Sequence, residues 1–360
     1  MNSYLLLIIG LVVLVGAAEL FVRGASNLAA RLGVSALVVG LTVVAFGTSA
    51  PELAVSLSAV ANGTPDLAVG NAVGSNIFNV LFILGLTALI RPLIVAQKLV
   101  RIDVPIMIAA AGALWVMCLD GRLGRIEGGV LFAGIIAYVF FAVRSARRES
   151  AAVRAEYDEA STAKPGKPIF VTLCLLVAGL VGIVLGARLF VRGATEIAAS
   201  LGVSDLVIGL TIVAAGTSMP EVATSVVAAL KGHRDIAVGN VVGSNIFNVL
   251  AILGVTGVAS PGGLPVPASV LAFDLPVMFA VSIACLPVLI TGLGISRFEA
   301  GVLFVGYLAY TAYLVLDTTG HDRLAGFSAI TLWFALPLAG VGILGMGYGW
   351  ARQKTRGERL

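Results

Sequence analysis

The chain has 360 residues, of which 59% are hydrophobic and only 12% are charged. Ordinary soluble domains carry about 25% charged residues, so this composition excludes a soluble enzyme and indicates an integral membrane protein. The apolar residues come in runs of about 20, which is the length of a membrane-crossing helix, whereas barrel strands alternate over about 10 residues. The net charge of +4 comes from short scattered loops, so nothing supports nucleic-acid binding.

The apolar runs predict eleven membrane helices. The first run lacks the basic start and the cleavage site of a secretory signal, so we interpret it as the first of these helices. The polar stretch that ends at Lys167 carries six basic and four acidic residues and is typical of a solvated linker. The predicted helices lie at about 4–22, 36–60, 67–90, 103–119, 126–143, 169–191, 205–229, 236–259, 271–290, 297–316 and 327–349.

The distribution of Lys and Arg predicts the orientation. With the N-terminus outside, 18 of the 23 basic residues fall on the cytoplasmic side, where such residues concentrate. This count places the basic tail inside, which requires the eleventh run to cross the membrane. We therefore expect a multi-pass protein of a prokaryotic inner membrane with its N-terminus outside and its C-terminus inside.

The chain contains an internal repeat. Residues 40–87 and 209–256 are identical at 32 of 48 positions when they are aligned at an offset of 169, which indicates a duplicated unit. Each unit contains five predicted helices, and an odd number means that the second unit enters the membrane from the opposite side. Inverted repeats of this kind are typical of secondary transporters, which bind their substrate near the midplane.

The predicted fold is therefore an all-α polytopic membrane protein with two inverted five-helix repeats, which form a ten-helix core, and an eleventh C-terminal helix. The first repeat spans residues 1–144 and the cytoplasmic linker spans 145–168. The second repeat spans 169–316, and residues 317–360 form the extra helix and a basic cytoplasmic tail.

Two carboxylates lie well inside predicted membrane helices. An ionisable residue in a membrane core costs about 2.5–3.5 kcal/mol on insertion scales, so Glu52 and Glu221 are functional candidates. Each follows the motif Gly-Thr-Ser-x-Pro. Because proline has no N–H, we expect helix breaks in which Pro51 frees the carbonyl of Gly47 and Pro220 frees that of Gly216.

Further polar residues share helical faces with these glutamates, because positions three and four apart lie on one side of a helix. All the candidate ligands are oxygen atoms, which suit hard cations such as calcium and sodium. One Ca²⁺ or two monovalent ions would neutralise two carboxylates, and the empty site would carry two uncompensated charges, which favours obligatory exchange. The stripes are Ala45, Thr48 and Glu52, then Asn71, Ser75 and Asn79 with Asn76, and in the second copy Ala214, Thr217 and Glu221, then Asn240, Ser244 and Asn248 with Asn245.

The two copies of GTS-x-PE followed by GN-x-VGSNIFN resemble the paired repeats of the calcium/cation antiporter superfamily, and in particular its prokaryotic sodium/calcium exchangers. The resemblance implies a ten-helix core that exchanges sodium for calcium, without a cofactor and without an obligatory protein partner. It implies calcium ligands at Glu52, Glu221, Thr48 and Thr217. It implies sodium sites at Ala45, Ser49, Ser75, Ala214, Ser218 and Ser244, together with both glutamates. Asn79 and Asn248 depart from members that carry an Asp at one of these positions.

Three other functions are consistent with parts of the sequence. A proton/calcium exchanger of the same superfamily is the main alternative, because a buried glutamate can accept a proton. An intramembrane serine protease would need a base, yet both histidines lie in loops, so we expect no catalytic residue. A passive cation channel is the third alternative, and the paired breaks favour alternating access over it.

Overall fold

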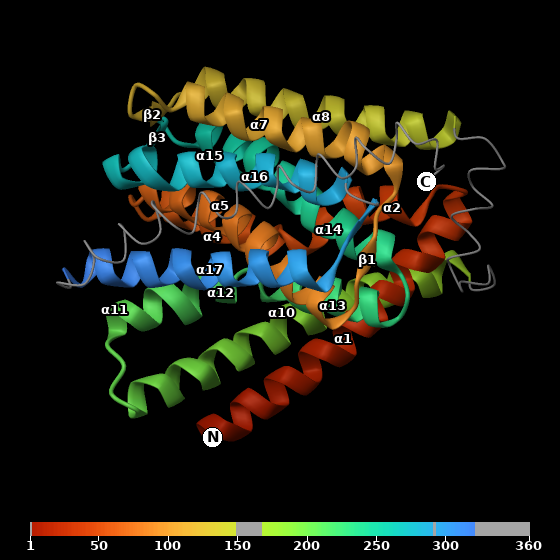
Figure 1. Ribbon diagram of the computed structural model, residues 1–360, viewed down its shortest axis with the longest axis horizontal. Coiled ribbons are helices and arrows are strands. Elements are labelled where there is room, and N and C mark those ends of the chain that lie inside the picture. The colour runs from red at the N-terminus through yellow and green to blue at the C-terminus, as the bar shows by residue number, and fades with distance from the viewer. Residues whose placement is uncertain (1, 149–167, 291–292, 321–360) are drawn as a thin grey trace.

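The computed structural model describes residues 2–148, 168–290 and 293–320. Helices occupy each of the first ten predicted segments, and they form a bundle whose long axis is horizontal in Figure 1. The predicted eleventh helix at 327–349, the basic tail and most of the linker lie outside the described residues.

The first half runs from α1 to α8. Its elements in order are α1 (Ser3–Leu32), α2 (Ala36–Val39), η1 (Gly40–Val44), α3 (Ala45–Thr48), α4 (Ala50–Ala61), α5 (Asp66–Phe78), η2 (Asn79–Leu84), α6 (Gly85–Ile90), β1 (Leu93–Ile94), η3 (Leu99–Asp103), α7 (Val104–Met117), β2 (Arg122–Leu123) and α8 (Arg125–Arg148). The elements labelled η are single π-helical turns.

The second half repeats this order. Its elements are α10 (Ile169–Ser200), α11 (Asp205–Ile208), η4 (Gly209–Val213), α12 (Ala214–Gly216), α13 (Met219–Leu230), α14 (Arg234–Phe247), η5 (Asn248–Leu253), α15 (Gly254–Ala259), β3 (Leu264–Pro265), η6 (Val270–Asp274), α16 (Leu275–Ile290), β4 (Gly294–Ile295) and α17 (Arg297–Thr318).

Seven helices of the described residues are long and apolar enough to cross a membrane. The segments Ala36–Thr48 and Ala50–Ala61 form an eighth span that is bent by 40°, and Met219–Leu230 and Val270–Leu286 are apolar but shorter. The chain is therefore a multi-pass helical membrane protein. The seven are Ser3–Leu32, Asp66–Ile90, Leu99–Met117, Arg125–Ser145, Ile169–Ser200, Arg234–Ala259 and Arg297–Thr318.

Two helices are longer than the sequence predicts. We expected the first and sixth helices to end near residues 22 and 191, but α1 continues to Leu32 and α10 to Ser200. The added turns contain no proline, and Ala, Leu and Arg favour a helix as strongly inside the membrane as outside it. α1 ends at Gly33, whose φ of 61° is the left-handed conformation that stops a helix.

The π-helical turns were not predicted from the sequence. They occur at equivalent places in the two halves, and η2 and η5 begin at Asn79 and Asn248. Within two of these turns, η1 and η4, a threonine hydroxyl donates to the carbonyl four residues back, from Thr42 to Val38 and from Thr211 to Val207, both at 2.6 Å. Such bonds compete with the regular helical pattern. Single π turns in α-helices are frequent at functional sites.

α1 and α10 pack against each other closely and lie along the lower edge of the bundle in Figure 1. A Cβ atom at Gly193 would lie 2.6 Å from the nitrogen of Leu7, and one at Gly24 would lie 2.9 Å from Cγ of Leu176. The start of α1 therefore contacts the end of α10, so the two equivalent helices are antiparallel. Glycine allows this approach because it has no side chain.

Two short ribbons join the halves. β1 pairs antiparallel with β4, with Leu93 opposite Ile295, and β2 pairs antiparallel with β3, with Arg122 opposite Pro265. Each ribbon takes one strand from each half. The centre of the bundle is formed by α5 and α14 with the turns that follow them, and residues 236–250 are all buried. This central position places the polar faces of α5 and α14 inside the protein.

Candidate functional site

The two glutamates lie in the protein interior. Glu52 and Glu221 are each 1% exposed and stand in the first turns of α4 and α13. Ser218 Oγ donates to Glu52 Oε1 at 3.0 Å, and Ser49 Oγ donates to Glu221 Oε1 at 3.1 Å. Each carboxylate is thus bound by a serine of the opposite half.

Five buried oxygen atoms of the predicted site residues make no hydrogen bond in the described residues. Burying a polar atom without a partner costs free energy, so a group of such atoms is a candidate for binding a cation. One more hydroxyl continues the network, because Ser75 Oγ lies 3.2 Å from Ser218 Oγ. The five unpaired atoms are Glu52 Oε2, Glu221 Oε2, Asn79 Oδ1, Asn248 Oδ1 and Ser244 Oγ.

The helix breaks lie next to the predicted residues. The first break is at Ser49, which separates α3 from α4, and the second lies between α12 and α13. Pro51 and Pro220 occupy the first turns of the helices after the breaks, where a missing N–H is tolerated. A new helix N-terminus, which carries partial positive charge, begins beside each glutamate.

The glycines of the break motifs have a packing role that the sequence does not reveal. A Cβ atom at Gly47 would lie 3.1 Å from the ring of Phe21 in α1, and one at Gly216 would lie 2.8 Å from a methyl group of Val191 in α10. Glycine at these positions therefore lets the two long helices lie against the broken spans.

Asn71 and Asn240 connect each glutamate-bearing helix to the next helix. Each amide nitrogen donates to the backbone oxygen of the glutamate and to a serine one helical turn after that glutamate. Both serines were missed by the sequence analysis, although their i+4 spacing from the glutamates is a usable signal. The contacts are Asn71 to Glu52 O at 3.4 Å and Ser56 Oγ at 3.2 Å, and Asn240 to Glu221 O at 3.4 Å and Ser225 Oγ at 2.9 Å.

Four asparagines meet between α5 and α14. Asn79 Nδ2 donates to Asn245 Oδ1 at 3.0 Å, and Asn248 Nδ2 donates to Asn76 Oδ1 at 3.0 Å. Asn76 Nδ2 also donates to the backbone oxygen of Asn245 at 3.3 Å. We call these four residues the amide cluster. All four are buried, and every side-chain bond between them joins one half of the chain to the other.

The surroundings of the site differ between the halves. α14 packs against α2, η1 and α3, so a Cβ atom at Gly239 would lie 3.0 Å from Leu37 O and one at Gly243 would lie 2.7 Å from Leu41 O. At the equivalent Gly70 of α5, no atom of the described residues lies within 4 Å of such an atom. The first half of the broken span is therefore packed closely on α14, whereas its copy approaches α5 less closely and contacts it through α12.

The predicted ligands of the first half are more buried than those of the second half, in agreement with the difference in packing. Ala45 and Thr48 are fully buried, and Thr48 Oγ1 donates to Asn240 Oδ1 at 3.0 Å. Ala214 is exposed, and Thr217 Oγ1 donates to the carbonyl oxygen of Ala214 in its own helix at 3.5 Å. The predicted ligands from α3 thus lie in the closed interior, while those from α12 line the more accessible side.

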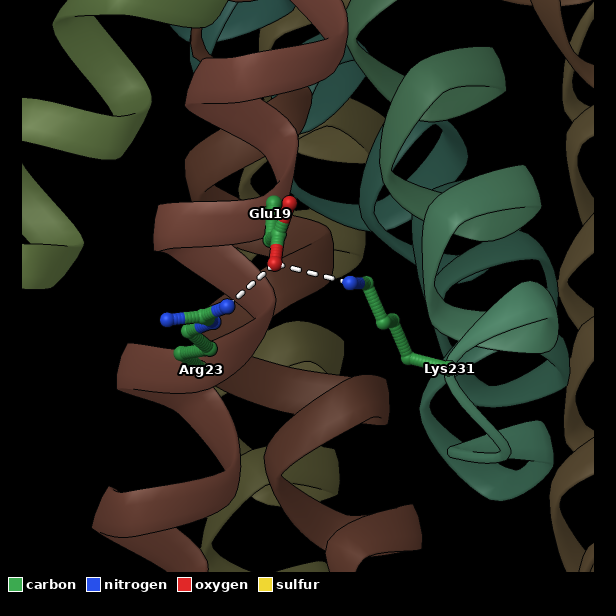
Figure 2. A network of polar contacts seen from close by, with 3 residues as sticks. All are labelled: Glu19, Arg23 and Lys231. Atoms are coloured by element: carbon green, nitrogen blue, oxygen red, sulfur yellow. Dashed lines mark hydrogen bonds and ion pairs between the residues drawn. The ribbon is translucent and has the colours of Figure 1, made fainter.

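An ion-pair network lies outside the site. Glu19 of α1 binds Arg23 one turn later and Lys231 Nζ at 2.8 Å (Figure 2). Lys231 directly follows α13, so the network ties α1 to the end of that helix. In the second half, Arg192 binds Glu196 of its own helix at 2.9 Å.

The candidate ligands among the described residues are oxygen atoms. In the described part of the chain, no group of three or more His, Cys, Asp or Glu side chains is arranged to hold a metal ion. The arrangement is instead two carboxylates surrounded by hydroxyl and amide oxygens, which suits calcium and sodium.

The fold and the site define a multi-pass membrane transporter of cations. The family model for the sodium/calcium exchanger protein matches residues 2–144 and 171–316. The chain therefore belongs to the sodium/calcium exchanger family, whose proteins are antiporters.

Curated relatives match along most of their length. The chain is 38% identical to the putative antiporter CaxA of Alkalimonas amylolytica over 315 residues, which cover 86% of this chain and 98% of the relative. It is 37% identical over 349 residues to the sodium/calcium exchanger MaX1 of Methanosarcina acetivorans, covering 87% of this chain and 98% of the relative.

A solved structure has the same fold. The sodium-calcium exchanger NCX_Mj soaked with zero Na⁺ and Ca²⁺ aligns with a TM-score of 0.73 and 32% sequence identity. The alignment covers 87% of this chain and 98% of that chain.

Proposed function

We propose that this chain exchanges sodium for calcium across a membrane, with calcium and sodium competing for one site between Glu52 and Glu221. The observation that supports this proposal best is the pair of buried carboxylates, each with one oxygen bound by a serine of the other half and one oxygen unpaired. The two unpaired oxygens are available to a cation.

The charges of the site support exchange. Two carboxylates balance one Ca²⁺ or two Na⁺, and an empty site would leave two negative charges inside the membrane, where charge is costly. The binding site then switches its opening from one side of the membrane to the other with either ion bound, and switches poorly when it is empty. This requirement couples the two fluxes. In this proposal Glu52, Glu221, Thr48 and Thr217 bind calcium.

Sodium occupies overlapping positions. Its proposed ligands are Ala45, Ser49, Ser75, Ala214, Ser218 and Ser244, together with the two glutamates. The reciprocal bonds between serines and glutamates support this overlap, because a sodium ion at either serine would lie beside a carboxylate.

Alternating access follows from an inverted relation between the halves. The antiparallel packing of α1 on α10 and the reciprocal bonds at the glutamates support a two-fold axis in the membrane plane. We place the N-terminus outside a prokaryotic inner membrane. The separated faces of α5 and η4 then face outside, and the packed faces of α14 and η1 close the cytoplasmic side.

The test is uptake of radioactive calcium into proteoliposomes that contain the purified chain. We expect uptake with sodium inside and little uptake with potassium or choline inside. Uptake driven by an imposed proton gradient without sodium would instead establish the proton/calcium exchanger. Uptake that needs neither internal sodium nor protons would indicate a channel and contradict the proposal.

A further inference from the structure

The amide cluster contains two kinds of asparagine. Asn79 and Asn248 each have a buried Oδ1 atom that has no hydrogen bond to any described residue, whereas the Oδ1 atoms of Asn76 and Asn245 each accept a bond from the other half. All four are predicted as supporting polar residues, and their geometry divides them into two pairs with different roles.

Asn76 and Asn245 are fixed by bonds of their own. Asn76 Nδ2 donates to the backbone oxygen of Asn245 at 3.3 Å and lies 3.5 Å from Met278 Sδ. Asn245 Nδ2 lies 3.4 Å from Met107 Sδ. Turning either amide over would direct its oxygen at another acceptor, so each presents its Oδ1 atom to the opposite half.

A fixed acceptor determines the orientation of its partner. An amide has its donor and acceptor at opposite ends of a planar group. Because Asn76 Oδ1 accepts from Asn248 Nδ2, the oxygen of Asn248 is turned away from Asn76 and stays unpaired. Asn245 does the same for Asn79.

The freed oxygens belong to residues that share a helical face with serines of the predicted site. Asn79 is one helical turn after Ser75, and Ser75 Oγ lies 3.2 Å from Ser218 Oγ, which donates to Glu52. Asn248 follows Ser244, whose Oγ atom is also buried and unpaired, by the same spacing. Two amide oxygens are thus added to the two free carboxylate oxygens.

We propose that Asn76 and Asn245 are positioning residues, which hold the amide nitrogens of Asn248 and Asn79 and thereby direct two neutral oxygens to the transported cation. This inference rests on the proposed cation site, but not on the identity of the driving ion. Neutral oxygens complete the coordination shell and leave the charge of the site at that of its two glutamates.

The test is a double-mutant cycle read out by calcium binding to the purified full chain in isothermal calorimetry. Removal of a residue that orients a metal ligand typically lowers affinity by about 10–100-fold, so we expect Asn76→Ala to raise the Kd for calcium by at least about tenfold. This loss should disappear in an Asn248→Ala background, where there is no amide left to orient. It should persist in an Asn79→Ala background.

The second half supplies the mirrored control. The effect of Asn245→Ala should disappear in Asn79→Ala and persist in Asn248→Ala. If the Asn248→Ala background binds too little calcium to measure, Asn248→Ser retains a small oxygen ligand and removes the same amide. Equal losses from Asn76→Ala in both backgrounds, or no loss in any background, would overturn the positioning role.

Two readouts separate this proposal from its alternatives. A purely structural role would lower the thermal midpoint of the calcium-free protein and would not depend on which partner is removed. Sodium-independent uptake by the wild-type chain would contradict the proposed exchange and leave the binding cycle valid, so the two proposals fail in different experiments.

Discussion

The two halves of this protein share one sequence motif, but they differ in how tightly the broken span packs on its neighbour. In one half, η1 and α3 lie against α14, with Gly243 close to the backbone of Leu41. In the other half, no described atom lies within 4 Å of the Cβ position of the equivalent Gly74. One sequence pattern is therefore compatible with a closely packed and a loosely packed arrangement, which is what a transporter with two inverted halves needs if it opens to each side in turn.

The largest expected effect tests what the halves have in common. Glu52→Gln and Glu221→Gln should each abolish calcium uptake, because each variant removes one of the two carboxylates that balance Ca²⁺. Removing one partner of a buried pair of opposite charges costs about 3–5 kcal/mol, or more than about 100-fold in affinity. The two variants should be equally impaired although their surroundings differ. Asp66→Asn, at the partly exposed start of α5, is the control and should retain uptake. Near-normal flux in either glutamine variant would refute the shared site.

A pair of glycine variants tests the difference directly. Gly243→Ala should lower the stability of the protein by about 1–3 kcal/mol, because its Cβ atom would lie 2.7 Å from Leu41 O. Gly74→Ala should leave the thermal midpoint unchanged and slow transport, because the added methyl group interferes only in the conformation in which η4 packs against α5. Thermal unfolding and calcium flux would be measured for both. Equal destabilisation by the two variants would show that the halves are packed alike.

Thiol labelling tests which side is accessible. In a background without Cys118, Cys174 and Cys285, an impermeant reagent added outside should label Ala214→Cys at least about tenfold faster than Ala45→Cys, since tenfold corresponds to about 1.4 kcal/mol between conformations. Ala214 is exposed and Ala45 is fully buried. Faster labelling of Ala214→Cys from the cytoplasmic side would show that the proposed orientation is reversed. Equal labelling of both variants would contradict a difference in accessibility between the halves.

The smallest expected effect concerns the ion pair in Figure 2. Lys231→Gln removes the bond from Lys231 to Glu19, which joins α1 to the end of α13, on the side where the halves are packed. A partly exposed pair contributes about 0.2–1 kcal/mol, so labelling of Ala45→Cys from the cytoplasmic side should rise by no more than about fivefold. The matched control is Arg192→Gln, whose pair stays within α10 and should leave this labelling unchanged. An increase in the control as large as in Lys231→Gln would show that the pair does not fasten the packed side.

The sequence predicts the helices and the burial of the two glutamates, because membrane insertion imposes a simple rule on both. Continuous apolar runs define the helices, and the cost of burying Glu52 and Glu221 marks them without knowledge of the fold. The positions of the first ten helices are confirmed. The predicted lengths of α1 and α10 were wrong, since nothing in the composition of these helices marks where a helix leaves the bilayer.

Other features depend on packing that a single sequence does not encode. The two ribbons arise from pairing between strands far apart in the chain, and the π-helical turns that begin at Asn79 and Asn248 were not predicted. Ser56 and Ser225 were missed because the hydroxyl of a serine in an apolar helix can also bond to a backbone carbonyl of the same helix, so its presence alone does not indicate a site. The asymmetry between the halves could not be predicted, because the repeated motif is the same in both.

The ribbons have a consequence for how the protein is made. β1 and β2 leave the ribosome first, yet their partners β4 and β3 are encoded in the second half of the chain. Until that half is synthesised, two strand edges are unpaired and the carboxylate of Glu52 lacks the hydroxyl of Ser218. The first five helices therefore complete their packing only after the second half of the chain has been synthesised.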